Sequence, residues 1–176
     1  MYSGGTMPEF YPWVVKEAGF KFGDEKVEQK DMDIDPPNVN HEFLKALQKE
    51  NCFNRRSFEK WERIMHSHGA SLREVFNLRY GRFERYVDVV VYPSSTEHVE
   101  KIVQLADSHN VVIVPYGGGT NVTQALYLQP QSKWPDARMV VSLDMSRMNK
   151  VVWVDKDNMI ACVQAGIRGQ DLERDL

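Results

Sequence analysis

The chain has 176 residues, of which 42% are hydrophobic and 27% are charged, and its formal net charge is −3. This is the composition of an ordinary globular protein, and the near-balanced charge excludes one whose main task is to bind nucleic acid. The two cysteines are too few for a disulfide framework, and residues 1–5 lack the features of a secretory signal, so we expect an intracellular, reducing compartment.

Residues 1–85 are rich in charged and aromatic side chains, and their apolar positions fall at helical spacing. Pro12 in a first turn and Gly19 at an end favour a short helix between them. The aspartates and prolines of residues 31–37 predict an extended, solvated linker, because a residue before proline avoids the helical region. We therefore expect residues 1–85 to form an N-terminal helical region.

Two further helices are expected in this region. Asn40 is placed to cap the first of them. Its apolar face holds Phe43, Leu44 and Leu47. The second begins after Ser71 and ends at Gly81. Its side chains at three- and four-residue spacing are Leu72, Val75, Phe76 and Arg79.

Valine-rich runs between turn residues follow this region. Residues 87–92 and 111–114 predict buried strands, and residues 96–108 predict a helix between them. Ser94 and Glu97 fit a capping box at the start of this helix. Its apolar face holds Val99, Ile102, Val103 and Ala106. Fully apolar strands on either side of a helix are typical of a parallel crossover. We therefore expect the two strands to be parallel neighbours in one sheet, joined through the helix by a right-handed crossover.

Three more elements complete the chain. Residues 140–143 predict a third strand, and residues 151–154 and 159–163 predict a hairpin around a turn at 155–158. A last helix begins near Gln170, and the chain stops within it.

The expected fold class is therefore α+β. The helical region of residues 1–85 precedes residues 86–176, which form the first part of an α/β domain with a strand–helix–strand unit and a hairpin. Because a domain seldom ends inside one of its own elements, we expect the domain to be incomplete and the chain to be an N-terminal fragment.

The most informative residues, called the glycine loop below, directly follow the second buried strand. They are Pro115, Tyr116, Gly117, Gly118, Gly119, Thr120 and Asn121. Consecutive glycines can take positive φ angles and expose backbone N–H groups with no Cβ in the way. Such a nest of donors binds anions, a diphosphate above all, and Thr120 and Asn121 add side-chain donors. The pattern is neither a Walker loop nor a Gly-x-Gly-x-x-Gly motif, and it leaves two interpretations open: a diphosphate-binding loop and a tight turn.

A glycine loop after a Val/Ile strand, with a strand ending in Pro-Ser and an amphipathic helix before it, resembles the FAD-binding domain of the vanillyl-alcohol oxidase and p-cresol methylhydroxylase (PCMH) superfamily. Within that superfamily, the chain from about Pro8 to its end is similar to the alkylglycerone-phosphate (alkyl-dihydroxyacetonephosphate) synthases. The residues that carry this likeness are His68, Gly69, Leu72, Glu74, Phe76, Phe83, Glu84, Arg85, Asp88, Val89, Val90, Ser142, Leu143, Asp144, Met148, Asn149, Trp153, Val154, Asp155, Ala165, Gly166, Ile167, Gly169, Gln170, Leu172 and Glu173. Tyr116 and Asn121 depart from the aliphatic residue and serine of relatives, and the loop at 128–137 is longer.

The resemblance implies a PCMH-type FAD-binding domain over residues 86–176, with residues 115–121 holding the flavin diphosphate. It also implies an enzyme that exchanges the acyl chain of acyl-dihydroxyacetone phosphate for a long-chain alcohol, making the ether bond of ether lipids with FAD as covalent partner. The family's catalytic groups would lie beyond Leu176, so no residue here is assigned a catalytic role, and we expect the 176 residues alone to be inactive. A peroxisomal location, a homodimer and a peripheral membrane contact are implied too, although the chain shows no peroxisomal motif.

Two other functions stay open. One is another FAD-dependent oxidoreductase of the same superfamily, of the 2-hydroxyacid dehydrogenase type, and the other is a truncated product without enzymatic activity. The helical region before residue 87, with Phe83, Glu84 and Arg85, favours the synthase over the dehydrogenases.

Several side chains outside the loop have an ordinary interpretation that we prefer. His66 and His68 are expected at a helix end or on the surface rather than on a metal, and Asp31, Asp33 and Asp35 in solvent rather than on calcium. The cluster Arg55, Arg56 and Lys60 predicts a solvated helix face, with anionic lipid headgroups as the alternative. Small buried groups are expected at Cys52 and Cys162, and packing residues at Trp13, Trp61 and Trp153.

Overall fold

A computed structural model describes residues 8–19, 32–130 and 137–176, and the chain divides into two compact units, residues 1–30 and 31–176. Helix α1 (Phe10–Ala18) is the described element of the first unit. Pro12 lies in its first turn, and Gly19 ends it with a φ of 69°, in the left-handed region. The short helix expected between these two residues is confirmed.

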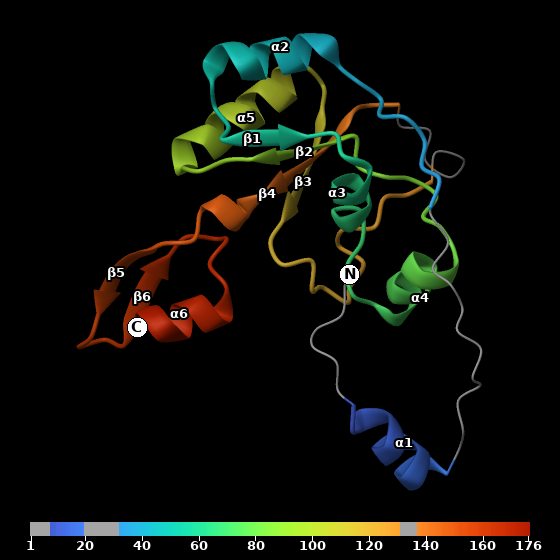
Figure 1. Ribbon diagram of the computed structural model, residues 1–176. Coiled ribbons are helices and arrows are strands. Elements are labelled where there is room, and N and C mark those ends of the chain that lie inside the picture. Colours follow the sequence, from blue (N-terminus) through green and yellow to red (C-terminus); the bar gives the residue numbers. More distant parts are fainter. Residues whose placement is uncertain (1–7, 20–31, 131–136) are drawn as a thin grey trace. The chain divides into compact units, whose positions relative to one another are not determined.

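A four-stranded sheet forms the centre of the second unit (Figure 1). Its strands are β1 (Arg55–Ser57), β2 (Val89–Tyr92), β3 (Val112–Tyr116) and β4 (Val140–Asp144), in the spatial order β1-β2-β4-β3. Strands β2 and β3 both run parallel to β4, and β1 pairs antiparallel with β2.

The strand order corrects one expectation. Strands β2 and β3 are parallel members of one sheet, as predicted, but they are not neighbours, because β4 lies between them. All five residues of β4 are buried, as suits a central strand, whereas β3 is mostly half-buried at the sheet edge. The apolar run of β4 thus takes the position with a partner on both sides.

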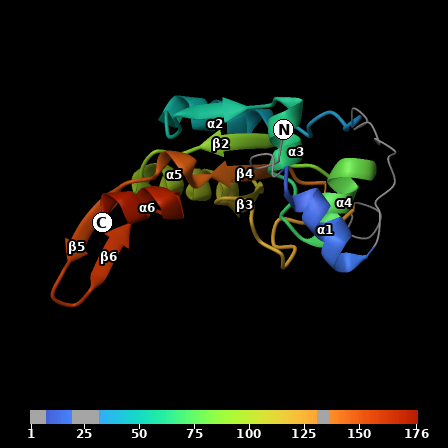
Figure 2. The same cartoon turned by 60° about the horizontal axis from the view of Figure 1, so that its bottom comes forward.

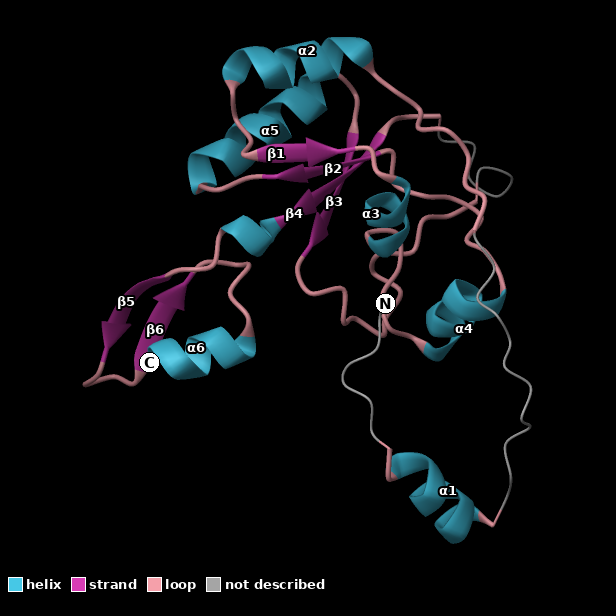
Figure 3. Ribbon diagram, viewed as in Figure 1, coloured by secondary structure: helices cyan, strands magenta, loops and turns pink. Residues whose placement is uncertain are grey.

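Two helices, α2 (His41–Glu50) and α5 (Thr96–Ser108), cover one face of the sheet (Figure 3). Phe43 and Leu47 of α2 and Ile102 of α5 are fully buried against alternate strand residues. Those strand residues are Val89, Val91, Val141 and Leu143. The apolar face predicted for α5 is right for Ile102 and Ala106, but Val103 is exposed, and Leu105 packs against the core instead.

The helix caps follow the predictions with one exception. The Asn40 side chain accepts a hydrogen bond from the Phe43 N–H, and Ser71 forms a capping box with Glu74 at the start of α4 (Leu72–Tyr80). The cap of α5 is Ser95 rather than Ser94, since the Ser95 hydroxyl accepts from the His98 N–H. Adjacent serines offer the same chemistry, and the backbone conformation decides between them.

Part of the region before residue 86 pairs with the sheet and packs against it. Strand β1 pairs with β2, and α2 packs on α5, so both belong to the unit that holds the later strands. A helix α3 (Lys60–Met65) follows β1. The helix face expected at Arg55 and Arg56 is therefore wrong, because both residues lie in an edge strand, where charged side chains are common. A domain division between residues 85 and 86 stays a prediction.

The expected linker is extended but not wholly solvated. Residues 32–40 carry no helix or strand, and Asp33 and Asp35 are exposed, whereas Asp31 lies outside the described residues. Met32 is buried, and Ile34 packs beside it. Their cluster also holds Ile64, Leu78, Phe83 and Tyr86. Apolar side chains at alternate positions thus anchor this extended segment.

Strand β4 continues through a 3-10 turn, η1 (Met145–Arg147), into the predicted hairpin. The hairpin pairs β5 (Val151–Asp155) with β6 (Ile160–Val163), and helix α6 (Gly169–Asp175) follows it (Figure 2).

Packing expected of some large side chains is not found. Trp13, Trp61 and Trp153 are each 45–57% exposed, and Cys162 is half-buried while Cys52 is buried. None of the helices in the part of the chain that the structure describes is long and apolar enough to span a membrane.

Candidate functional site

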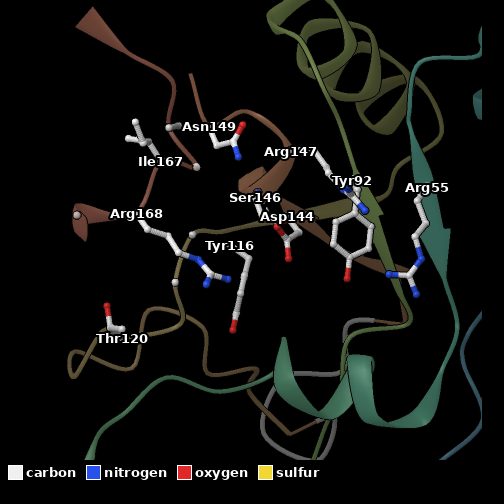
Figure 4. Close-up of a pocket in the computed structure, with 15 residues that line it drawn as sticks. Arg55, Tyr92, Tyr116, Thr120, Asp144, Ser146, Arg147, Asn149, Ile167 and Arg168 are labelled. Atoms are coloured by element: carbon white, nitrogen blue, oxygen red, sulfur yellow. Dashed lines mark hydrogen bonds between the residues drawn. The ribbon is translucent and has the colours of Figure 1, made fainter. Parts of the chain in front are cut away.

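A cavity of about 940 Å³ lies beside the glycine loop (Figure 4). Each strand of the sheet contributes one side chain to its wall, namely Arg55 from β1, Tyr92 from β2, Tyr116 from β3 and Asp144 from β4. The strand register brings these residues to one edge, because Arg55 lies opposite Tyr92 and Tyr116 lies opposite Asp144. The last three are the final residues of parallel strands, the usual place for ligands in an α/β sheet.

Four of the seven predicted loop residues line this cavity. They are Tyr116, Gly117, Gly118 and Thr120, whereas Pro115, Gly119 and Asn121 do not line it. The loop therefore meets the cavity through its central glycines. Pro115 belongs to the edge strand β3, and Asn121 contacts a different part of the chain.

The loop glycines differ in their backbone roles. Gly119 alone of the three has a positive φ, at 66°, and a Cβ there would overlap the Tyr116 hydroxyl. A Cβ on Gly117 would meet nothing within 4 Å, and one on Gly118 would meet the Thr120 methyl at 3.6 Å. The positive φ that consecutive glycines can take is thus found at Gly119, which turns the chain, whereas Gly117 and Gly118 leave open space beside the cavity.

A buried hydrogen-bonded pair, His66 and Asp144, lies at the cavity wall. Nε2 of His66 is 2.7 Å from Oδ2 of Asp144, and Nδ1 of His66 is 2.7 Å from the carbonyl oxygen of Glu62. Burial alone would raise the pKa of the Asp144 carboxyl, but hydrogen bonds from His66 and Ser146 outweigh it and lower the pKa. The His66 ring thus bridges the Glu62 carbonyl and the Asp144 carboxylate.

The His66 ring also contacts Tyr116, with ring centroids 4.1 Å apart. A buried imidazole therefore lies against Tyr116, the aromatic residue of the glycine loop. Of the two positions expected for His66, a helix end or the surface, the helix end is found, since the residue is the buried C-cap of α3; His68 is buried as well, not on the surface. No group of three or more His, Cys, Asp or Glu side chains that could hold a metal occurs within residues 8–19, 32–130 and 137–176.

A second hydrogen-bonded group lines the wall near β1. The Tyr92 hydroxyl donates to Oε2 of Glu62 at 2.6 Å, and Arg55 pairs with Oε1 of the same carboxylate. Burial raises the pKa of the Tyr92 hydroxyl, and the contact with Glu62 raises it further. The Tyr92 hydroxyl therefore stays protonated and donates its hydrogen bond to Glu62.

Residues 165–169 form the opposite wall of the cavity, together with η1. Gly166 makes this wall possible, because a Cβ there would overlap the carbonyl of Met145, and its N–H donates to the Met148 carbonyl at 2.8 Å. Arg147 and Arg168 are exposed, and no carboxylate among the described residues pairs with either. Figure 4 shows the Arg168 side chain extending toward Tyr116. Two cations thus border a space that open glycine backbone borders on the other side.

Sequence reasoning did not place Arg55, Tyr92, Asp144 or Arg168 in the site. For Tyr92 and Asp144, the available signal is their position as the last residue of a parallel strand. For Arg55 and Arg168 no comparable signal exists, because their place depends on how distant segments meet.

Several known proteins are similar to this chain. The sequence profile of the family described as "FAD binding domain" matches residues 87–176. An alkyldihydroxyacetonephosphate synthase of Caenorhabditis elegans is 40% identical over 178 residues, which cover 99% of this chain and 28% of that protein. A solved structure described as "alkyldihydroxyacetonephosphate synthase in P1" matches 95% of this chain and 31% of its own, with a TM-score of 0.81 and 38% identity. A mitochondrial D-lactate dehydrogenase (cytochrome) of Kluyveromyces lactis is 27% identical over 99 residues, which cover 55% of this chain and 16% of that protein.

These comparisons confirm the sequence-based likeness to the synthases and the PCMH-type fold class. The likeness to the synthase covers nearly the whole chain, whereas that to the dehydrogenase covers about half of it. The chain itself spans about 28% of the length of the synthase relative.

Proposed function

The chain belongs to the FAD-binding domain family, and on that premise we propose that its glycine loop and the facing arginines hold the diphosphate of FAD. The observation that carries this proposal is the meeting of Gly117 and Gly118 with Arg147 and Arg168 around one cavity. Open glycine backbone and unpaired guanidinium groups are the donors that a diphosphate requires.

The residues present fit this group in shape as well as in charge. The positions of Gly117 and Gly118 are open where a Cβ would stand, so a phosphate can approach the backbone closely. The cavity volume of about 940 Å³ lies at the upper end of the range usual for ligand sites.

Each residue has a definite task in this proposal. The glycine N–H groups and Thr120 donate to the diphosphate, and Arg168 closes over it from the opposite wall. Asp144 has no contact with the diphosphate in this proposal. Its two carboxylate oxygens are hydrogen-bonded to His66 and to the Ser146 N–H instead. Bound FAD would supply the flavin ring as the reacting group, and the chain's own residues orient its diphosphate end.

We further propose that the protein acts as an alkylglycerone-phosphate synthase. Support comes from the likeness to synthases across nearly the whole chain and from a TM-score of 0.81 with a synthase structure. The substrates would then be acyl-dihydroxyacetone phosphate and a long-chain alcohol, and the location would be peroxisomal. A homodimer and a peripheral membrane contact belong to the same proposal.

The decisive experiment replaces Gly118 by valine in the full gene product. We expect the purified Gly118→Val protein to lose FAD absorbance while its thermal midpoint in the absence of FAD stays near that of the unchanged protein. The reason is that a Cβ at position 118 would meet only the Thr120 side chain, at 3.6 Å, and that the φ of Gly118 lies outside the left-handed region, so the added methyl groups extend into the space proposed for the diphosphate.

The matched control is Gly81→Val, which makes the same chemical change at the end of α4, outside the cavity. It is expected to retain FAD. A Gly118→Val protein with a full flavin spectrum would show that this loop does not hold the diphosphate.

A further inference from the structure

Residues 68–71 lie in the connection between α3 and α4 and bend at Ala70, and we call this segment the Gly69 turn. Its polar groups are fixed from both sides. The Gly69 N–H donates to Oε1 of Glu74 at 2.8 Å, and Nδ1 of His68 donates to the Gly69 carbonyl at 2.7 Å. The His68 ring is buried and stacks on Phe83, with centroids 5.2 Å apart and planes within 5° of parallel.

Glu74 is the centre of this arrangement, with only 2% of its surface exposed. Its second oxygen accepts from the Ser71 N–H at 3.1 Å and from the Ser71 hydroxyl at 2.5 Å. Burial alone would raise the pKa of the Glu74 carboxyl, but these hydrogen bonds outweigh it and lower the pKa. Burying a carboxylate costs free energy, which its three hydrogen bonds from neutral donors offset. A fully hydrogen-bonded buried group of this kind holds the Gly69 turn rigid.

The Gly69 turn rests directly on the end of the glycine loop. The Ala70 N–H donates to the Asn121 carbonyl at 2.7 Å, and a Cβ on Gly69 would overlap that same carbonyl oxygen. The Asn121 side chain in turn accepts from the Ala125 N–H at 3.0 Å. Only glycine at position 69 lets the two backbones approach this closely.

The glycine loop needs such a contact because its own strand supports it on one side only. Strand β3 is at the sheet edge, and Gly117, Gly118 and Thr120 are exposed. We propose that the Gly69 turn, fixed by Glu74 and His68, is the support that positions the glycine loop for anion binding. This inference rests on the proposed diphosphate site and assigns Gly69, His68 and Glu74 as positioning residues.

The test compares Gly69→Ala with Gly81→Ala in the full gene product. These two glycines stand before and after the same helix, and a Cβ on Gly81 would meet only ordinary contacts at 3.5 Å. Hydrogen exchange of residues 116–122 is measured without FAD, and FAD affinity is measured by quenching of flavin fluorescence. Gly69→Ala is expected to speed exchange in the loop and to weaken FAD binding about tenfold or more, the loss of one charge-assisted hydrogen bond.

Gly81→Ala is expected to leave both quantities unchanged. Should Gly69→Ala fail to fold, Glu74→Gln replaces it, since this change keeps the shape of the side chain but aims an amide group at the donors of the turn. Glu74→Gln is expected to speed exchange in residues 116–122 and to weaken FAD binding.

The results separate this inference from the proposed function. Unchanged loop exchange in a folded Gly69→Ala or Glu74→Gln protein would overturn the inference, as would faster exchange with unchanged FAD affinity. Faster exchange with weakened affinity supports it. If Gly118→Val also retains FAD, the diphosphate site is wrong, and the positioning role falls with it.

Discussion

The buried side chains of Asp144 and His66 lie beside the glycine loop, with Oδ2 of Asp144 2.7 Å from Nε2 of His66. The lowered pKa of Asp144 means that the folded state binds its proton less readily than the unfolded chain does. Such a carboxylate contributes stability above its unfolded pKa, near 3.9, and that contribution is lost as the pH falls through the lower folded value. The Asp144 carboxylate should therefore be a source of acid sensitivity.

We expect Asp144→Asn to lower the free energy of unfolding at pH 7 by about 3 kcal/mol, because it removes one member of a buried pair. Below about pH 4, the unchanged protein should lose stability more steeply than the variant, since the variant has no carboxylate to protonate at this site. Urea unfolding at pH 7, 4 and 3 measures both effects. Parallel pH dependence of the two proteins would contradict the assignment of an ionised Asp144.

At the scale of single elements, the start of α5 offers a direct comparison of two neighbouring serines. The Ser95 hydroxyl accepts from the His98 N–H at 3.3 Å, whereas the Ser94 hydroxyl contacts only the His98 side chain. Ser95→Ala is expected to lower the free energy of unfolding by about 1 kcal/mol, the usual cost of losing a helix cap. Ser94→Ala should cost about half of that or less, being an exposed surface change. Thermal or urea unfolding of the two variants measures these losses. A larger loss of unfolding free energy for Ser94→Ala than for Ser95→Ala would show that Ser94 caps the helix.

The elements show where sequence reasoning succeeds. Helices α2, α4 and α5 were predictable because their caps and apolar spacing are local signals. The hairpin was predictable for the same reason, since its turn residues lie directly between two largely apolar runs. Such patterns report on a few neighbouring residues, and the structure confirms them within one or two positions.

What could not be predicted depends on distant contacts. The insertion of β4 between β2 and β3 is decided by which apolar strand is best buried on both sides. Strand β1 has only three residues and two arginines, so it carries no alternating apolar pattern. The same limit applies to the site: the glycines identify the loop, but Arg55, Arg168 and the Gly69 turn reach it only through the fold.

At the scale of the whole molecule, the proposed diphosphate site would be one end of a binding site for a large cofactor. They span about 28% of the length of the synthase relative. The hairpin beside the cavity keeps Val152, Trp153, Met159 and Ile160 at least half exposed. Apolar side chains in this number on a small two-stranded unit are typical of a surface that further chain or a partner covers.

We therefore expect these 176 residues alone to hold FAD weakly and to show no synthase activity. The glycine loop and Arg168 can contribute a few charge-assisted hydrogen bonds of about 1.5–3 kcal/mol each. Association costs about 4–15 kcal/mol in lost freedom, so a diphosphate cradle without a pocket for the flavin ring leaves little net affinity. Flavin fluorescence quenching and the formation of alkyl-dihydroxyacetone phosphate measure the two properties. Micromolar FAD binding with turnover by residues 1–176 would show that the cavity described here is already a complete site.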